Sequence, residues 1–175
     1  NRELNKLAEC IRNEVVYDMT NKGLSEFDFT ENEIYFVESN TLDETELILN
    51  LLKWRNAVSN LNNETFQIIS PFNEGAGSVS KINELFHQNY LKSYNPDTKN
   101  FQEPVIVKRN LYNLDLSNGE TGYLKNKDEN WIFQTSDLNS TYIIPYGLID
   151  AFEKAYAITV HKSQGLTFDK AILDV

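Results

Sequence analysis

The sequence predicts an α/β protein in which the main domain is interrupted by a small β-barrel. Apolar strands and amphipathic helical patterns share the first hundred residues, and α/β texture returns after about residue 146, as is typical of α/β domains. Between these parts, from Pro104 to about Pro145, the chain has short extended segments without helical periodicity. A length of 175 residues allows one sizeable core, or one core with a small inserted module.

The first part of the main domain is predicted to contain two helices and a short strand. From residue 1 to about residue 18, apolar residues recur at the spacing of an amphipathic helix. Ile34–Val37 is a short apolar strand candidate. Thr41 followed by Glu44 forms a capping box, which predicts a second helix. The Asn-rich stretch 56–63 is predicted to be a surface connection.

One complete α/β unit follows. Phe66–Ser70 is short, apolar and β-rich, which predicts a buried strand. A glycine-containing loop, Pro71–Gly77, leads into a helix predicted over Ser78–Asn89. The residues that fall on one side of this helix are Ile82, Leu85, Phe86 and Asn89.

The inserted module is predicted to be built from short strands. The candidate strands are Pro104–Asn110, Thr121–Asn126, Asn130–Thr135 and Thr141–Pro145. Asn118-Gly119 is a hairpin signal, because both turn positions of that hairpin type need positive φ. We therefore assign residues 101–145 to the module, and residues 1–100 together with 146–175 to one discontinuous α/β domain.

The chain ends in an apolar strand, Lys170–Val175, and begins without a methionine. A natural end inside such a strand would leave backbone groups unpaired. We therefore expect further segments on both sides of this chain.

The net charge of −10 is unfavourable for binding nucleic acid, since phosphates attract a basic surface. The excess lies mainly in residues 1–100, which have 9 Lys/Arg against 16 Asp/Glu, while residues 101–175 have 7 against 10. Contact with DNA would have to come from a local patch. The single cysteine, Cys10, excludes an internal disulfide, and no apolar run is long enough to span a membrane, so the protein is predicted to be cytoplasmic.

The densest group of polar side chains lies in Ala155–Asp169. Its members are Thr159, His161, Lys162, Ser163, Gln164 and Gly165. Apolar residues precede the group and a strand follows it, which places it on a loop at the edge of a parallel sheet, where α/β domains bind ligands. Hydroxyl, imidazole and ammonium groups can donate to a nucleic-acid backbone. The alternative is a polar loop whose His and Thr bond their own backbone.

Four segments of the chain resemble RecD-like superfamily 1 helicases. Tyr156–Phe168 resembles motif V in its T-x-H-K-S-Q-G form. Ile68–Asn83 resembles the strand, E-G-x-x-G loop and L-N helix of RecD subunits, with Ile82 in place of the usual Leu. Pro104–Gly122 resembles the P-V-M-x-x-R-N…L-x-N-G-x-x-G signature that opens their SH3-like barrel, and Asn1–Ile11 resembles their L-A-x-x-I helix. The likeness is closest to alpha subunits of exodeoxyribonuclease V.

The resemblance implies a RecA-like second helicase domain, of the P-loop NTPase type, interrupted by an SH3-like β-barrel. It implies a fragment of an ATP-dependent helicase that moves 5′ to 3′ on DNA, within a nuclease that acts in double-strand break repair and recombination. The implied partners are single- and double-stranded DNA and RecB- and RecC-like subunits, with no membrane. The implied cofactors, ATP and Mg²⁺, belong to the full-length parent.

The resemblance also assigns roles to residues. Those that contact single-stranded DNA, or lie beside the contact, are Thr159, His161, Lys162 and Ser163. Gln164 and Gly165 lie toward the ATP cleft.

A second implied group lies elsewhere in the chain. Pro71 and Asn73 lie on the side of the domain along which the DNA strand passes, although many relatives carry Arg where this chain has Asn73. Lys108, Arg109 and Asn110 open the barrel and are candidate contacts to DNA or to a partner subunit, or else a solvated strand edge.

Several parts of an ATPase site are missing from the sequence. Gly-Lys does not occur, so there is no G-x-x-x-x-G-K-[ST] phosphate loop, and no apolar strand ends in Asp-Asp or Asp-Glu to hold Mg²⁺. We expect no ATP hydrolysis, no bound cofactor and at best weak DNA binding from this chain alone. His87, His161 and Cys10 lack metal-ligand spacing, so no metal site is predicted.

Two alternatives remain at this stage. One is a stand-alone RecD-like or relaxase-type helicase, which shares motif V and the barrel; the E-G-A-G loop and the first helix favour the subunit. The other is a non-catalytic module that binds a protein through the barrel.

Overall fold

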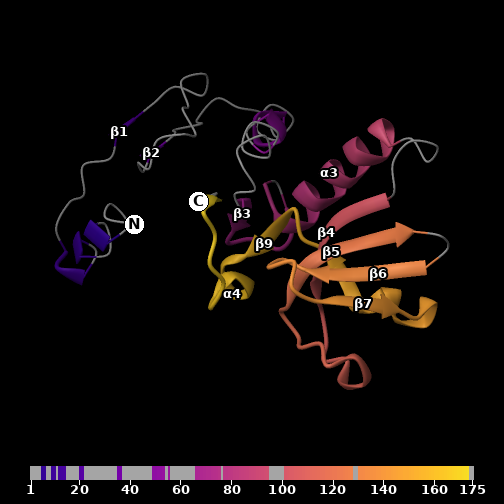
Figure 1. The fold of residues 1–175 in the computed structure, drawn as a ribbon. Helices are drawn as coiled ribbons and strands as arrows, with labels where there is room; N and C mark the ends of the chain where they lie inside the picture. Colours follow the sequence, from indigo (N-terminus) through magenta and orange to yellow (C-terminus); the bar gives the residue numbers. More distant parts are fainter. Residues whose placement is uncertain are drawn as a thin grey trace. The chain divides into compact units, whose positions relative to one another are not determined.

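The computed structural model of the chain describes residues 5–6, 9–10, 12–14, 20–21, 35–36, 49–53, 55, 66–75, 77–94, 101–127 and 130–173 (Figure 1). The chain divides into two compact units, Asn1–Glu64 and Thr65–Val175. In the described part, no helix is long and apolar enough to cross a membrane.

The described parts of the first unit contain helix and strand where both were predicted. Residues 5–6, 9–10 and 12 are helical, whereas Asn13 and Glu14, which were predicted to be helical, form a turn in which Glu14 has a φ of 54°. Residues 15–18 of the predicted helix lie outside the described residues. Strand β2 (Tyr35–Phe36) pairs in parallel with β1 (Thr20–Asn21), and residues 49–53 are helical. The capping box and the stretch 56–63 lie outside the described residues.

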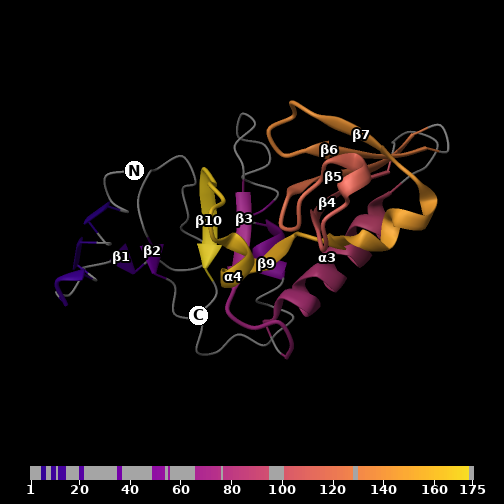
Figure 2. The same cartoon turned by 90° about the horizontal axis from the view of Figure 1, so that it is seen from below.

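The second unit contains a three-stranded parallel sheet in the order β10 (Lys170–Leu173), β3 (Phe66–Ser70) and β9 (Ala157–Thr159), which Figure 2 shows side by side. Strand β3 has the bounds predicted from the sequence. Helix α3 (Val79–Ser93) follows β3 and contacts β9. The predicted strand–loop–helix unit is therefore confirmed.

Helix α3 differs from its prediction at its end and on its buried face. Ser78 is the N-cap, and its hydroxyl accepts a hydrogen bond from the Lys81 N–H at 3.3 Å. The helix continues one turn beyond Asn89, which is exposed. The buried stripe is Val79, Ile82, Asn83 and Phe86, so the buried amide on this helix is Asn83 rather than Asn89.

A five-stranded antiparallel sheet occupies the predicted module (Figure 1). Its strands, in the order β7-β6-β5-β4-β8, are β7 (Thr141–Ile144), β6 (Asn130–Thr135), β5 (Thr121–Lys127), β4 (Phe101–Val107) and β8 (Phe152–Lys154). The four predicted strands are present, but β4 begins and ends three residues earlier than Pro104–Asn110, so Lys108–Asn110 lie after the strand. Strand β8 extends the sheet past residue 145.

The sheet is open, so the closed barrel expected from the sequence is not found. Among the described strands, β7 and β8 are the two edges and do not pair with each other. The connection between them is a 3₁₀ helix, Tyr146–Ala151, and β8 is only three residues long. The short β8 reaches only the end of β4, where Val107 pairs with Phe152.

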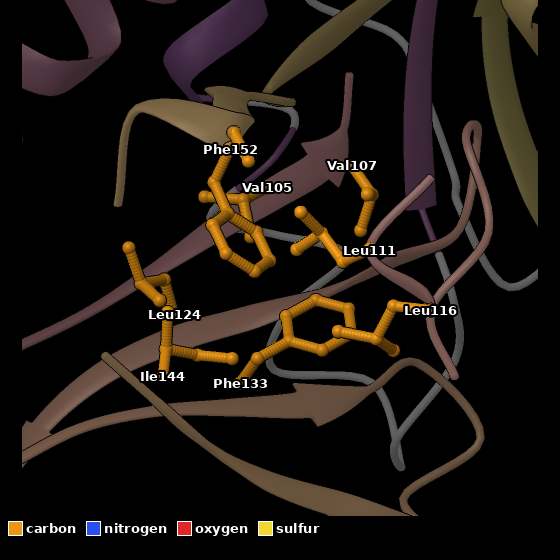
Figure 3. Packing of buried hydrophobic residues seen from close by; sticks show 9 residues of the cluster. Val105, Val107, Leu111, Leu116, Leu124, Phe133, Ile144 and Phe152 are labelled. Atoms are coloured by element: carbon orange, nitrogen blue, oxygen red, sulfur yellow. The ribbon is translucent and has the colours of Figure 1, made fainter. Parts of the chain in front are cut away.

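The core of the antiparallel sheet is a single apolar cluster around Phe133 (Figure 3). The Phe133 ring is fully buried and its centroid lies 5.2 Å from that of Phe152. The other members are Val105, Val107, Leu111, Leu116, Leu124, Ile144 and Ala151. Gly122 lies against this core, and a Cβ there would come within 2.2 Å of the Gln134 carbonyl oxygen, so no larger residue fits without a backbone shift.

The turn at Asn118-Gly119 is present but differs in type from the prediction. The Glu120 N–H donates to the Ser117 carbonyl at 3.2 Å, which closes a four-residue turn. Gly119 has a φ of 89°, but Asn118 is not among the residues with positive φ. The turn therefore needs glycine at one position only.

Candidate nucleic-acid interface

Two loops begin at the carboxyl ends of neighbouring strands, and so at the same end of the parallel sheet. Strands β3 and β9 are parallel neighbours, and their last residues, Ser70 and Thr159, are register partners. The loop Pro71–Gly77 follows one strand, and the cluster that begins at Thr159 follows the other. The sequence prediction that this cluster lies at a parallel-sheet edge is therefore confirmed.

The cluster is one turn of helix, α4 (Val160–Ser163), closed by its own hydroxyls. The Thr159 hydroxyl accepts from the Lys162 N–H at 3.2 Å, and the Ser163 hydroxyl donates to the Val160 carbonyl at 2.8 Å. For Thr159 the alternative of local backbone bonding is thus correct, and Ser163 bonds the local backbone as well. The side chains of His161 and Gln164 are exposed.

Gly165 ends the turn in the left-handed region, with a φ of 82°. No heavy atom lies within 4 Å of the position that a Cβ would take there. The backbone at this glycine is therefore open to the approach of a ligand.

Lys162 has an acidic partner. Its ammonium lies 2.7 Å from a Glu153 carboxylate oxygen, and each of the two side chains is 35% exposed. Because Glu153 belongs to β8, this ion pair joins α4 to the antiparallel sheet. A phosphate at Lys162 would have to share the ammonium with this carboxylate.

The loop after β3 is shaped by hydrogen bonds to its backbone. The Ser70 hydroxyl donates to the Gly77 carbonyl at 3.2 Å and accepts from the Phe72 N–H at 3.3 Å. The Asn73 carbonyl accepts from the Ser80 hydroxyl at 2.6 Å. Pro71 and Asn73 are exposed, so both predicted residues lie on the surface of this loop, and Asn73 brings no charge to it.

Lys108, Arg109 and Asn110 follow β4 and are exposed, and two of them have structural partners. Arg109 makes a two-pronged contact with Asp150, with both N···O distances 3.1 Å. These hydrogen bonds lower the pKa of the Asp150 carboxyl. Asn110 accepts from the Asn118 N–H at 2.8 Å, whereas Lys108 presents an exposed side chain.

Sequence reasoning missed the buried polar residues that hold the strands beneath the site. Asn83 and Gln67 are 5% and 7% exposed and bond the backbone of residues 154–157. Glu103 is 4% exposed; it accepts from the Tyr156 hydroxyl at 2.7 Å and contacts His87 Nδ1 at 2.6 Å. The signal available in the sequence was Asn83 itself, a helix-interior amide one position after Ile82 on the apolar stripe.

The described residues contain no group of three or more His, Cys, Asp or Glu side chains placed to hold a metal ion. The two loops at this end of the sheet contain glycines with positive φ: Gly75 and Gly77 in one, and Gly165 in the other.

Comparison with known proteins gives one curated relative of clear similarity. The chain is 30% identical over 115 residues to the RecBCD enzyme subunit RecD of Buchnera aphidicola, a match that covers 60% of this chain and 19% of that protein. The chain thus spans about a fifth of the length of that relative. None of the family profiles compared with the sequence matches it.

Among solved structures, the chain has a likeness to Bacteroides Pif1, crystallised bound to single-stranded DNA. The TM-score is 0.41 and the identity 18%, over 80% of this chain and 45% of that one. The sequence match to RecD confirms the resemblance predicted from the motifs, since this chain is similar to RecD over 115 residues.

Proposed function

We propose that the chain is a segment of an ATP-dependent DNA helicase of the RecD type, working 5′ to 3′, and that it supplies single-stranded DNA contacts and one edge of the ATP cleft. The observation that carries this proposal is the meeting of two loops at one sheet edge, because Ser70 and Thr159 are register partners on adjacent parallel strands. Ligands of α/β domains bind at this edge.

In this proposal the exposed side of α4 faces the DNA strand. His161 donates to a phosphate or sugar oxygen, and Lys162 adds charge that it shares with Glu153. Thr159 and Ser163 mainly keep the turn in shape, since their hydroxyls bond its backbone. Pro71 and Asn73, on the neighbouring loop, lie beside the same DNA strand.

The nucleotide is held mostly by residues outside this chain. Gln164 and Gly165 fit one side of a phosphate, since Gln164 is exposed and the backbone of Gly165 is open. The described residues contain no cluster of carboxylates that could hold Mg²⁺. ATP supplies the driving reaction in the whole protein, and this chain alone hydrolyses none.

The remaining parts of the proposal concern architecture and partners. We assign the parallel sheet with α3 to a RecA-like domain, and the antiparallel sheet to its SH3-like insertion, where Lys108, Arg109 and Asn110 meet DNA or a partner. The parent then acts with RecB- and RecC-like subunits in cytoplasmic DNA repair. A phosphate loop upstream and a Thr- and Arg-rich segment downstream in the flanking sequence would support this assignment.

His161→Ala tests the proposal in the full-length polypeptide that carries this chain. We expect about tenfold weaker binding to a fluorescent oligothymidine and a matching loss of duplex unwinding, because an exposed donor to the strand is removed. Lys162→Ala should also reduce the slope of log affinity against log salt by about one. Thr159→Ser keeps the capping hydroxyl and should retain both activities.

The matched control is Gln102→Ala, an exposed polar residue on the antiparallel sheet. Wild-type binding and unwinding by His161→Ala and Lys162→Ala would refute the role of α4. A protein partner that is retained by all variants, with no unwinding even in wild type, would favour the interaction module instead.

A further inference from the structure

The segment Lys154–Ala157 connects the antiparallel sheet to the parallel sheet and leads directly into the candidate DNA loop. It runs from the last residue of β8 to the first residue of β9, and β9 ends at Thr159. Side chains from three other elements bond it: Asn83 of α3, Gln67 of β3 and Glu103 of β4. The position of α4 is thus set by what holds this segment.

Asn83 makes the most complete set of these bonds. Its amide nitrogen donates to the Lys154 carbonyl at 2.8 Å and to the Ala157 carbonyl at 3.0 Å. Its amide oxygen accepts from the Ala157 N–H at 2.8 Å. The side chain is nearly fully buried, so water competes little for these hydrogen bonds.

The amide of Asn83 takes the place of a neighbouring strand. Strand β9 is at the edge of the parallel sheet in the described part of the chain, with β3 on one side only. In a β-strand, the N–H and C=O of one residue point to the same side. Asn83 binds both groups of Ala157, and therefore satisfies the backbone of this residue on the side of β9 that no strand covers.

We infer that Asn83 is a positioning residue for the DNA loop: it fixes the edge strand β9, and so the orientation of α4, without touching DNA itself. The inference rests on the proposed function. The geometric step is short, because Ala157 is two residues before Thr159, the N-cap of α4. Small displacements of binding groups cost affinity steeply.

The test compares Asn83→Ala and Asn83→Asp with Phe133→Leu in the full-length polypeptide. Asn83→Asp preserves the size of the side chain, but its ionised carboxylate cannot donate to the two carbonyls. Phe133→Leu destabilises the antiparallel core, whose cluster contains no residue of β9 or α4. Affinity for oligothymidine is measured at a temperature where all variants are folded, and amide hydrogen exchange is followed over residues 157–165.

We expect both Asn83 variants to bind the oligonucleotide about tenfold more weakly than wild type, and their amides at 157–165 to exchange about tenfold faster. Phe133→Leu, at a similar loss of thermal midpoint, should stay within about twofold of wild type in both measurements. If Asn83 variants and Phe133→Leu lose affinity equally, or if exchange at 157–165 does not change, Asn83 is only a stabilising residue and the inference is wrong.

The two proposals fail separately. A wild-type polypeptide that does not bind oligothymidine refutes the proposed function, while the exchange measurement still decides whether Asn83 holds the loop. Normal wild-type binding that persists in both Asn83 variants refutes only the positioning role.

Discussion

Both sheets of the second unit bury apolar side chains, but they differ in how many buried polar groups they contain. Nine buried apolar residues, Phe133 among them, form the core of the antiparallel sheet. The parallel sheet is braced by buried polar groups, and four of the six buried polar residues in the described part of the chain belong to β3, α3 or the loop between them: Gln67, Ser70, Ser78 and Asn83. Apolar burial is non-directional, whereas hydrogen bonds fix a definite geometry.

This difference matches what each sheet carries. The parallel sheet ends in the two loops of the candidate site, where the position of each backbone group matters. In the antiparallel sheet, strands β4 to β7 follow one another in sequence and pair in the same order. Its core depends mainly on apolar side chains that fill the available volume. We therefore expect changes in the antiparallel sheet to affect stability, and changes in the polar brace to affect the site as well.

The largest effect is expected for Phe133→Ala. The ring is fully buried among apolar neighbours, so its removal should lower the free energy of unfolding by about 3–5 kcal/mol. Urea denaturation followed by circular dichroism measures this change. Ile143→Ala, which truncates an apolar side chain 69% exposed on β7, is the control and should cost little. Equal losses in the two variants would contradict the cluster as the core of this sheet.

A smaller loss is expected for Gln67→Leu in the parallel sheet. Leu fills similar space but donates no hydrogen bond, which leaves the carbonyls of Ala155 and Tyr156 without the Gln67 amide. We expect the free energy of unfolding to fall by about 1–3 kcal/mol. Gln102→Leu, on the exposed side of β4, should change it by less than about 0.5 kcal/mol. A neutral or stabilising Gln67→Leu would show that polar bonding does not hold this sheet.

The sequence predicted the strands well, because they depend on local pattern. Phe66–Ser70 and Asn130–Thr135 were located to the residue, since each is a β-branched or aromatic run between polar or turn-forming residues. The loop after Thr159 was placed at a parallel-sheet edge for the same reason. The α/β class with an inserted antiparallel sheet followed from these elements.

What the sequence did not predict depends on contacts between distant elements. Asn83 lies on the buried stripe because residues 154–157 cross its helix, which no local pattern reveals. The described sheet is open because β7 and β8 do not pair, and pairing between distant strands is not visible in a local pattern. The partner of Lys162 was missed because the chain must turn between β8 and β9 to bring Glu153 beside it.

The smallest expected effect tests whether that ion pair limits the candidate site. Glu153→Gln removes the carboxylate that shares the Lys162 ammonium, and a pair this exposed contributes less than about 1 kcal/mol to stability. Affinity for single-stranded DNA should rise about threefold at low salt, and the gain should shrink as salt is added. The control Glu84→Gln removes the same charge from a carboxylate of α3, which lies near Lys154 of β8 instead of Lys162. If both variants gain affinity equally, the effect is one of net charge, and Lys162 has no particular part in holding the DNA strand. If only Glu153→Gln gains affinity, the Glu153 carboxylate of β8 limits how strongly the Lys162 ammonium attracts DNA.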